Sequence, residues 1–123
     1  MLTSIRVTAR VPGFHYWPGA PAPREYLGQQ HRHLFVFRLN MQVFTNDREV
    51  EFHDLADQLL ETARSLDVVE RDAPPVKTIN FGGRSCEQIG REILLVMGRR
   101  YRDRQMVIEV SEDDEFSAFV TLD

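Results

Sequence analysis

Three of the four histidines in this 123-residue chain are spaced so that they could share one metal ion. His31 and His33 are two residues apart, and in a strand both side chains would point to the same face. His15, in an aromatic segment before them, offers a third imidazole. Three neutral nitrogen ligands with one open position describe a catalytic zinc site. The alternative is that they are surface histidines, or core histidines hydrogen-bonded to their neighbours.

Glu112 is the second candidate for chemistry. Strand parity places it on one face with three apolar residues, Met106, Ile108 and Val110. A carboxylate in a buried row needs hydrogen-bond donors, and a heterocycle with an amidine-like N–H edge would supply two. The alternative is that Glu112 only opens a solvated turn with Asp113 and Asp114.

Three further titratable residues are weaker candidates. Asp67 follows the first predicted helix, where acidic loop residues are common. Cys86, in the first turn of the second predicted helix, could have a lowered pKa, although a small buried cysteine is the commoner case. His53 begins the first predicted helix, where a capping or surface role is more common than a catalytic one.

The elements that position these residues follow from hydrophobic periodicity. Residues 2–11 alternate apolar and polar side chains, which predicts a half-buried strand. Residues 12–28 hold four prolines and three glycines, which predicts a loop throughout. Because this segment also contains Phe14, His15, Tyr16 and Trp17, we expect it to line a cavity. Residues 31–45 alternate again and predict a long strand with both histidines on its apolar face.

The rest of the chain predicts a hairpin, two helices and a second hairpin. Asn46-Asp47 is a turn signal, and residues 49–52 are expected as a short return strand. A first helix follows, which ends before Pro74-Pro75 and has an apolar stripe of Leu55, Leu59, Ala63 and Leu66.

Ser85 and Gln88 have capping-box spacing, which predicts the start of a second helix with a stripe of Ile89, Ile93 and Val96 or Met97. Residues 104–112 and 116–122 predict two strands joined by an acidic turn. The predicted order is β-β-β-α-α-β-β. The predicted fold class is α+β, an antiparallel sheet with both helices on one face.

Composition limits the classes of protein that fit. A mass of 14.3 kDa allows one domain spanning residues 1–123. The formal net charge of −4 gives no global basic field for a nucleic-acid partner. The single cysteine, the absence of an apolar run near the roughly 20 residues of a membrane span, and the lack of a signal-like start favour a soluble, cytoplasmic protein without a membrane partner. A core this small also favours assembly with further copies of the chain.

Taken in order, these motifs resemble the 6-pyruvoyl-tetrahydropterin synthase and 6-carboxytetrahydropterin synthase family. The family has an HGH motif followed by an aromatic residue, and here the segment from His31 to Phe35 reads HRHLF. An acidic-Phe pair precedes the helix, as Glu51-Phe52 does here. Ser85-Cys86-Glu87 is similar to the family's T-x-E helix start, and Val110-Ser111-Glu112 to its strand-ending V-x-E. The resemblance covers nearly the whole chain.

This resemblance implies the tunnelling fold, in which subunits with a four-stranded sheet and two helices join into an oligomeric barrel, a hexamer or a tetramer, with active sites at subunit interfaces. It implies Zn²⁺ on His15, His31 and His33. It further implies a pterin ring held by Glu112, with help from Ser85 and Cys86 at the helix start. The substrate would be 7,8-dihydroneopterin triphosphate, and the bacterial branch makes 6-carboxytetrahydropterin for queuosine and other 7-deazapurines.

The chain departs from the family at the proton-transfer residues. The family's cysteine base lies four residues before the first histidine of the motif, and Leu27 occupies that position. Its Asp-His pair corresponds to Asp67 and Val68. A branch with a glutamate three residues before the motif is not matched either, because Gly28 lies there. Substitutes that the sequence offers are Glu25, Tyr26, Cys86 and His53. The alternative function is a catalytically altered or silent relative that binds zinc and a pterin-like or purine-like ligand.

Overall fold

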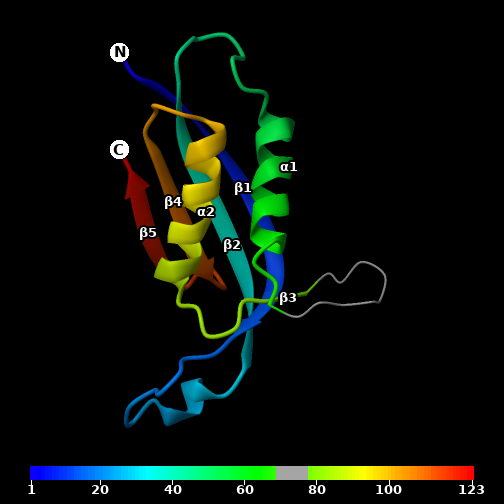
Figure 1. Cartoon of the computed structure of the whole chain (residues 1–123), viewed down its shortest axis with the longest axis vertical. Helices are drawn as coiled ribbons and strands as arrows, with labels where there is room; N and C mark the ends of the chain where they lie inside the picture. The colour runs from blue at the N-terminus through cyan, green and yellow to red at the C-terminus, as the bar shows by residue number, and fades with distance from the viewer. Residues whose placement is uncertain (69–77) are drawn as a thin grey trace.

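The computed structural model describes residues 1–68 and 78–123 as one sheet covered on one face by two helices (Figure 1). The sheet order is β3-β1-β2-β4-β5, in which the four long strands are antiparallel and β3 runs parallel to β1. The elements in chain order are β1 (Thr3–His15), a 3-10 turn η1 (Glu25–Gly28), β2 (His31–Val43), α1 (Phe52–Arg64), β3 (Ile79–Asn80), α2 (Cys86–Arg100), β4 (Met106–Glu112) and β5 (Phe116–Leu122). This confirms the predicted α+β class.

The core lies between the sheet and the helices, as the alternation predicted. Side chains at every second position of β2 are fully buried from Phe35 to Met41. The sequence left open whether Val96 or Met97 ends the apolar stripe of α2. Met97 is fully buried and Val96 is 38% exposed, so the stripe ends at Met97. Burial of these apolar side chains is the main force that holds the helices to the sheet.

Both helices begin at side chains that accept hydrogen bonds from their first turns. The predicted capping box of α2 is confirmed, because Ser85 Oγ accepts from the N–H of Gln88 and Gln88 Oε1 accepts from the N–H of Ser85. At α1 the cap is Glu51, whose carboxylate accepts from the N–H groups of His53 and Asp54.

The prediction of a loop from residue 12 onward was wrong for residues 12–15, which continue β1. Proline has no N–H to donate, so it is tolerated in a strand only where one side of the strand is unpaired. Strand β1 pairs with β3 only at Gly13 and Phe14, so the side of β1 that faces β3 is still unpaired at Pro12. The extension matters for the site, because it makes His15 part of a strand instead of a loop.

The predicted return strand at residues 49–52 is also wrong. In this segment the carboxylate of Glu49 accepts from the N–H of Phe44. Glu51 is the N-cap of α1, so the helix already begins at Phe52. Helix α1 then ends at Arg64, so Leu66 packs against the core from beyond the helix. Pro74 and Pro75 lie outside the described residues.

The short strand β3 was not predicted, since two residues carry no periodicity. It makes the sheet five-stranded, although the four long strands are those expected.

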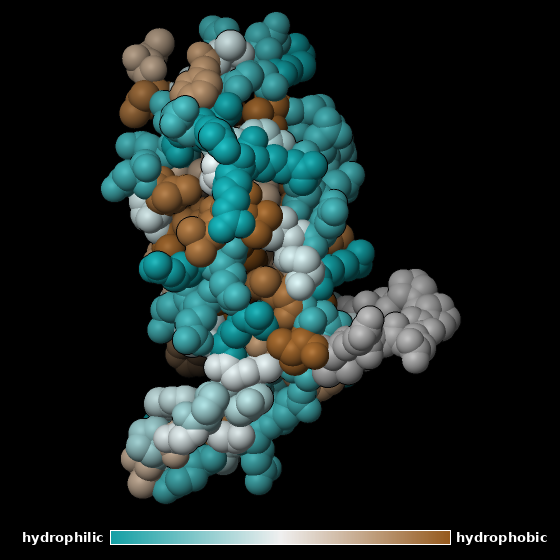
Figure 2. Space-filling view, viewed as in Figure 1, coloured by the Kyte–Doolittle hydropathy of each residue, from teal (hydrophilic) through white to brown (hydrophobic). Residues whose placement is uncertain are grey.

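Figure 2 shows mainly hydrophilic side chains on the face formed by the helices, with apolar patches between them. In the part of the chain that the structure describes, no helix is long and apolar enough to cross a membrane.

Candidate functional site

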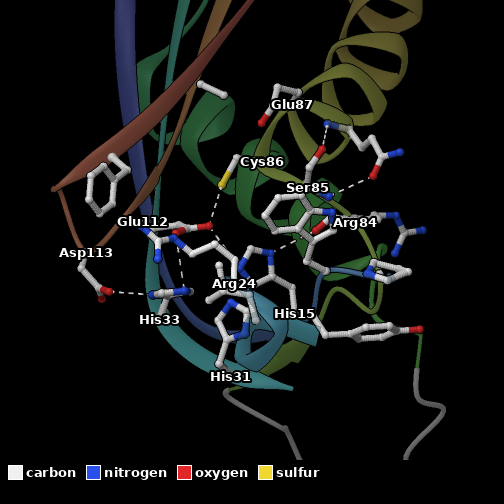
Figure 3. Close-up of a pocket in the computed structure, with 18 of the residues that line it drawn as sticks. His15, Arg24, His31, His33, Arg84, Ser85, Cys86, Glu87, Glu112 and Asp113 are labelled. Carbon is white, nitrogen blue, oxygen red and sulfur yellow. Dashed lines mark hydrogen bonds and ion pairs between the residues drawn. The ribbon is translucent and has the colours of Figure 1, made fainter. Parts of the chain in front are cut away.

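A pocket of about 1070 Å³ lies at the end of the sheet where β1 ends and β2 begins. Its walls come from the segment after β1, the start of α2 and the turn between β4 and β5 (Figure 3). His15, Tyr16 and Trp17 line it, which confirms the predicted cavity for these three residues, whereas Phe14 is not among the lining residues.

The three predicted metal ligands come together in this pocket. His15 is the direct cross-strand partner of His31, and Gly13 is the partner of His33, so the register places all three imidazoles on one face of adjacent strands. One ring nitrogen of each lies within 4.8 Å of the other two. The ring centroids are 4.6 to 5.3 Å apart, and Figure 3 shows the rings around a common space.

Each of these imidazoles has its Nδ1 atom next to a fixed acceptor. The acceptors are the carbonyl oxygens of Arg84 at 3.0 Å for His15 and of Gln29 at 2.9 Å for His31, and the carboxylate of Asp113 at 2.7 Å for His33. An acceptor at Nδ1 selects the tautomer with the proton on Nδ1 and leaves Nε2 as a lone-pair donor. The residues therefore fit a divalent metal of the kind that imidazole prefers, such as Zn²⁺.

His15 gives independent support for this fit. Its side chain is 9% exposed, and its Nε2 atom is buried with no hydrogen-bond partner among the described residues. A buried nitrogen without a partner is costly unless something else binds it, and a metal ion would satisfy it.

Glu112 ends the buried row of β4, as strand parity predicted, and it also lies beside the histidines. Its Oε1 atom is 3.1 Å from Nε2 of His15, outside hydrogen-bond geometry, and its Oε2 atom is 3.5 Å from Nε2 of His33. The neighbouring His15 is the main cause of a lowered pKa of Glu112, against the opposing effect of burial. The site thus holds an ionised carboxylate close to three imidazoles.

Cys86 contacts the same carboxylate. Its Sγ atom donates to Oε1 of Glu112 at 3.3 Å, and burial together with the charge of Glu112 raises the pKa of the thiol. A raised pKa keeps this cysteine as a thiol, so the geometry does not favour Cys86 as a thiolate base.

Ser85 lines the pocket, but its backbone N–H is engaged by the side chain of Gln88 in the capping box. Its carbonyl accepts from Ile89 within α2. The ligand contact expected of Ser85 stays a prediction.

The remaining proton-transfer candidates are dispersed. Glu25 is exposed on η1 and is not among the pocket-lining residues, whereas its neighbours Tyr26 and Leu27 are. Asp67 accepts from the N–H of Asn80, away from the pocket lining. Val68 donates its N–H to the carbonyl of the same asparagine and is 53% exposed. His53 lies exposed at the start of α1 and contacts Glu51.

The sequence did not predict three residues of the pocket, Asp113, Arg84 and Arg24. Asp113 was assigned only to a solvated turn, yet it contacts His33 from 80 residues away. Arg84 supplies the carbonyl that accepts from His15, while its guanidinium binds Glu92 and the carbonyls of Leu66 and Phe81. Arg24 lines the pocket from the segment before η1. No local pattern signals such contacts, because each depends on how distant segments meet.

Comparison with known proteins identifies the fold. No family model matches the chain, and no curated protein matches it significantly. Two similar solved structures are 6-pyruvoyl tetrahydropterin synthases. That of Plasmodium vivax is 14% identical with a TM-score of 0.66, covering 99% of this chain and 98% of that one. That of Plasmodium falciparum is 13% identical with a TM-score of 0.62, covering 98% of each chain.

An uncharacterised protein from Wolinella succinogenes is 10% identical, with a TM-score of 0.66 and 98% coverage of both chains. Two variants of the Plasmodium vivax enzyme, each 14% identical to this chain with TM-scores of 0.63 and 0.64, replace a glutamate described as a catalytic residue. These likenesses establish the fold of 6-pyruvoyl tetrahydropterin synthase for the residues that the structure describes.

Proposed function

We propose that this chain is a zinc-dependent enzyme of pterin metabolism that acts on 7,8-dihydroneopterin triphosphate in the manner of a 6-carboxytetrahydropterin synthase, a lyase on the route to queuosine. The observation that carries the proposal is the convergence of His15, His31 and His33, each with its Nδ1 atom beside an acceptor. The shared fold gives a second, weaker argument.

The three histidines would hold Zn²⁺ through their Nε2 atoms. When bound, the metal would supply Lewis-acid polarisation of oxygens on the substrate side chain, which makes neighbouring C–H bonds more acidic. His15 is the most buried of the three, so it would be fixed before the ion arrives and would lose little freedom on binding.

Glu112 would bind the heterocyclic ring. An ionised carboxylate accepts two parallel N–H bonds from an amidine-like edge in the way it accepts them from a guanidinium. The thiol of Cys86 donates to one of its oxygens and so orients the carboxylate. Trp17 and Tyr16 also line the pocket and offer flat apolar surface against which a ring can stack.

A second function is favoured by the proton-transfer positions. Leu27 lines the pocket but carries no transferable proton, and Val68 lies exposed away from it. The pKa of Cys86 is raised, and Asp67 is engaged by the backbone of Asn80. These features favour a silent relative that keeps the metal and a pterin-like or purine-like ligand without turnover.

The proposed partners are a small pterin-like molecule and further copies of the chain, in a hexamer or tetramer with sites at subunit interfaces. The pocket lies at one end of an open sheet, and residues of the edge strand β5 take part in its wall. A neighbouring subunit could therefore complete it and supply a missing acid or base. With a net charge of −4, nucleic acid is not proposed as a partner.

The test combines metal content, ligand affinity and turnover. Protein purified after zinc-supplemented expression should carry about one zinc per chain with nitrogen distances of roughly 2.0–2.1 Å. His33→Ala should abolish zinc binding, whereas the matched control His53→Ala, at the exposed histidine outside the pocket, should keep it. A wild-type protein without zinc would contradict the metal site.

Turnover distinguishes the two functions. With positioned acid–base groups supplying on the order of 10²–10⁴-fold each, a chain lacking two of them should convert dihydroneopterin triphosphate slowly or not at all. Leu27→Cys, inside the pocket, should then raise the rate, and Val68→His should add to this only if residue 68 of a neighbouring subunit reaches the pocket, because Val68 of the same chain is not among its lining residues. A normal wild-type rate would dismiss the silent relative and make Glu25 and Cys86 the next residues to replace.

A further inference from the structure

Asp113 is a carboxylate on the turn between β4 and β5 that the proposed chemistry does not use. Its Oδ2 atom lies 2.7 Å from Nδ1 of His33. The other two site histidines turn their Nδ1 atoms toward backbone carbonyls, so among the three only the Nδ1 atom of His33 faces a charged side chain.

Asp113 is itself held in place on β2. Its Oδ1 atom accepts from the N–H of Leu34 at 2.7 Å, and its own N–H donates to the carbonyl of Leu34 at 2.8 Å. Its backbone has a φ of 56°, in the left-handed region that aspartate and asparagine tolerate better than most residues. The carboxylate is therefore a fixed group that links the turn after β4 to β2. One oxygen accepts from Leu34 and the other lies beside His33.

We propose that Asp113 is a positioning residue, which fixes His33 as the Nδ1–H tautomer and increases the basicity of its Nε2 atom toward the metal. The inference rests on the proposed metal site. A carboxylate behind a ligating histidine is a common arrangement, and its loss typically weakens metal affinity by about 10–100-fold. His33 gains more from such a partner than His15 does, because its side chain is 21% exposed, against 9% for His15, and packing holds it less.

Neighbouring acids do not share this role. Asp114 is directed to Arg38 at 3.0 Å and to Ser111 at 3.5 Å. Glu112 approaches Nε2 of His33, the atom that would face the metal, and so cannot set the tautomer from behind the ring.

The test variant is Asp113→Asn. The asparagine oxygen can still accept from Leu34, and asparagine tolerates the positive φ, so the turn should fold as before. The amide nitrogen that replaces the other oxygen cannot accept a proton from Nδ1 of His33. The matched control is Glu51→Gln, which also removes one negative charge. It replaces a carboxylate that lies 2.9 Å from Nδ1 of the exposed His53, a histidine outside the site.

Zinc affinity is measured on metal-stripped protein by competition with a chromophoric chelator, with thermal melts to verify folding. Asp113→Asn should bind zinc about 10–100-fold more weakly than the wild type, and Glu51→Gln within about twofold. In parallel, ¹⁵N NMR of the metal-free wild type should find His33, assigned with His33→Gln, in the Nδ1–H tautomer, and Asp113→Asn should shift it toward a mixture. A purely structural role would not change that tautomer.

The outcomes separate this inference from the proposed function. If Asp113→Asn binds zinc as tightly as the wild type, the positioning role is wrong while the metal site stands. If the wild-type His33 is not in the Nδ1–H form, the inference fails without reference to any variant. If the wild type binds no zinc, the metal site fails and the inference fails with it.

Discussion

At the scale of single residues, the site depends on which atom of each side chain is already engaged. The three histidines use Nδ1 for acceptors within the fold, which leaves their Nε2 atoms directed to a shared space. Glu112 lies beside that space with a lowered pKa, mainly because of His15. Metal and ring binding would thus use different groups of one pocket.

Replacing Glu112 with Gln tests the ring contact. Glutamine keeps the shape but turns one acceptor oxygen into a donor, so an N–H edge would lose a charge-assisted bond of roughly 1.5–3 kcal/mol. Pterin affinity, measured by titration calorimetry on zinc-loaded protein, should fall by more than tenfold with the melting temperature little changed. An unchanged dissociation constant would leave Glu112 as a turn residue only.

At the scale of elements, the two-residue contact between β1 and β3 supports the end of β1 that carries His15. Gly13 allows this contact, because a Cβ atom there would lie 2.8 Å from the Phe35 ring, 2.9 Å from the Ile79 carbonyl and 2.9 Å from the Phe81 ring. Backbone and buried aromatic rings cannot move aside as a flexible side chain would. The fold of the site therefore depends on a position that touches no ligand.

Gly13→Ala should lower the free energy of unfolding by about 1–3 kcal/mol, the usual effect of overpacking a core. It should also weaken zinc binding, because His15 lies two residues along the same strand. Gly28→Ala is the control, since its Cβ atom would meet only the Trp17 carbonyl at an ordinary 3.5 Å. Chemical denaturation of both variants measures the difference, and equal stabilities would refute the packing argument.

The segment between β2 and α1 has a pH-dependent contact. Hydrogen bonds from the N–H of Phe44 and then from Arg104 hold the pKa of Glu49 below its ordinary value of 4.5. A carboxylate with a lower pKa in the folded state adds stability above its unfolded pKa, and this stability is lost as the pH falls through the folded value. The melting temperature should therefore decrease on acidification from about pH 6 to about pH 3.

Glu49→Gln should be less stable than the wild type at about pH 6, with the difference shrinking toward about pH 3, because the glutamine cannot ionise. Thermal melts by circular dichroism across this range measure both proteins. A stability difference that is independent of pH would show that the charge of Glu49 contributes nothing.

At the scale of the whole molecule, the sheet formed by residues 1–68 and 78–123 is open at both edges. Strand β5 has a partner on one side only, and it exposes Phe116 and Phe119 by 71% and 66%. Exposed strand edges favour pairing with another chain, and a closed ring of copies removes such edges. The sheet face that points away from the helices carries charged side chains, among them Arg38, which forms ion pairs with Glu109 and Asp114.

Light scattering coupled to size exclusion should therefore detect a closed oligomer, a trimer or hexamer, or else a tetramer. Phe119→Asp, on the exposed edge strand, should shift the equilibrium toward smaller species if β5 takes part in the contact. A wild-type protein that remains monomeric at micromolar concentration would contradict the proposed assembly.

Several features follow from the sequence alone because they depend on contacts only a few residues apart. Alternation placed His31 and His33 on the apolar face of one strand, and parity placed Glu112 at the end of the buried row in β4. The spacing of Ser85 and Gln88 marked the start of α2. Both periodicity and capping are local, so the four long strands and the two helices could be predicted.

Tertiary structure decided the remaining features, because they depend on how distant segments pair. The register of β1 against β2 set His15 opposite His31, and this pairing, with a short addition from β3, carries the strand past Pro12. The contact of Asp113 with His33 joins residues 80 apart, and no local pattern encodes it. Such contacts are fixed by the packing of the whole sheet and its core, where burial of many apolar side chains selects one register over its neighbours.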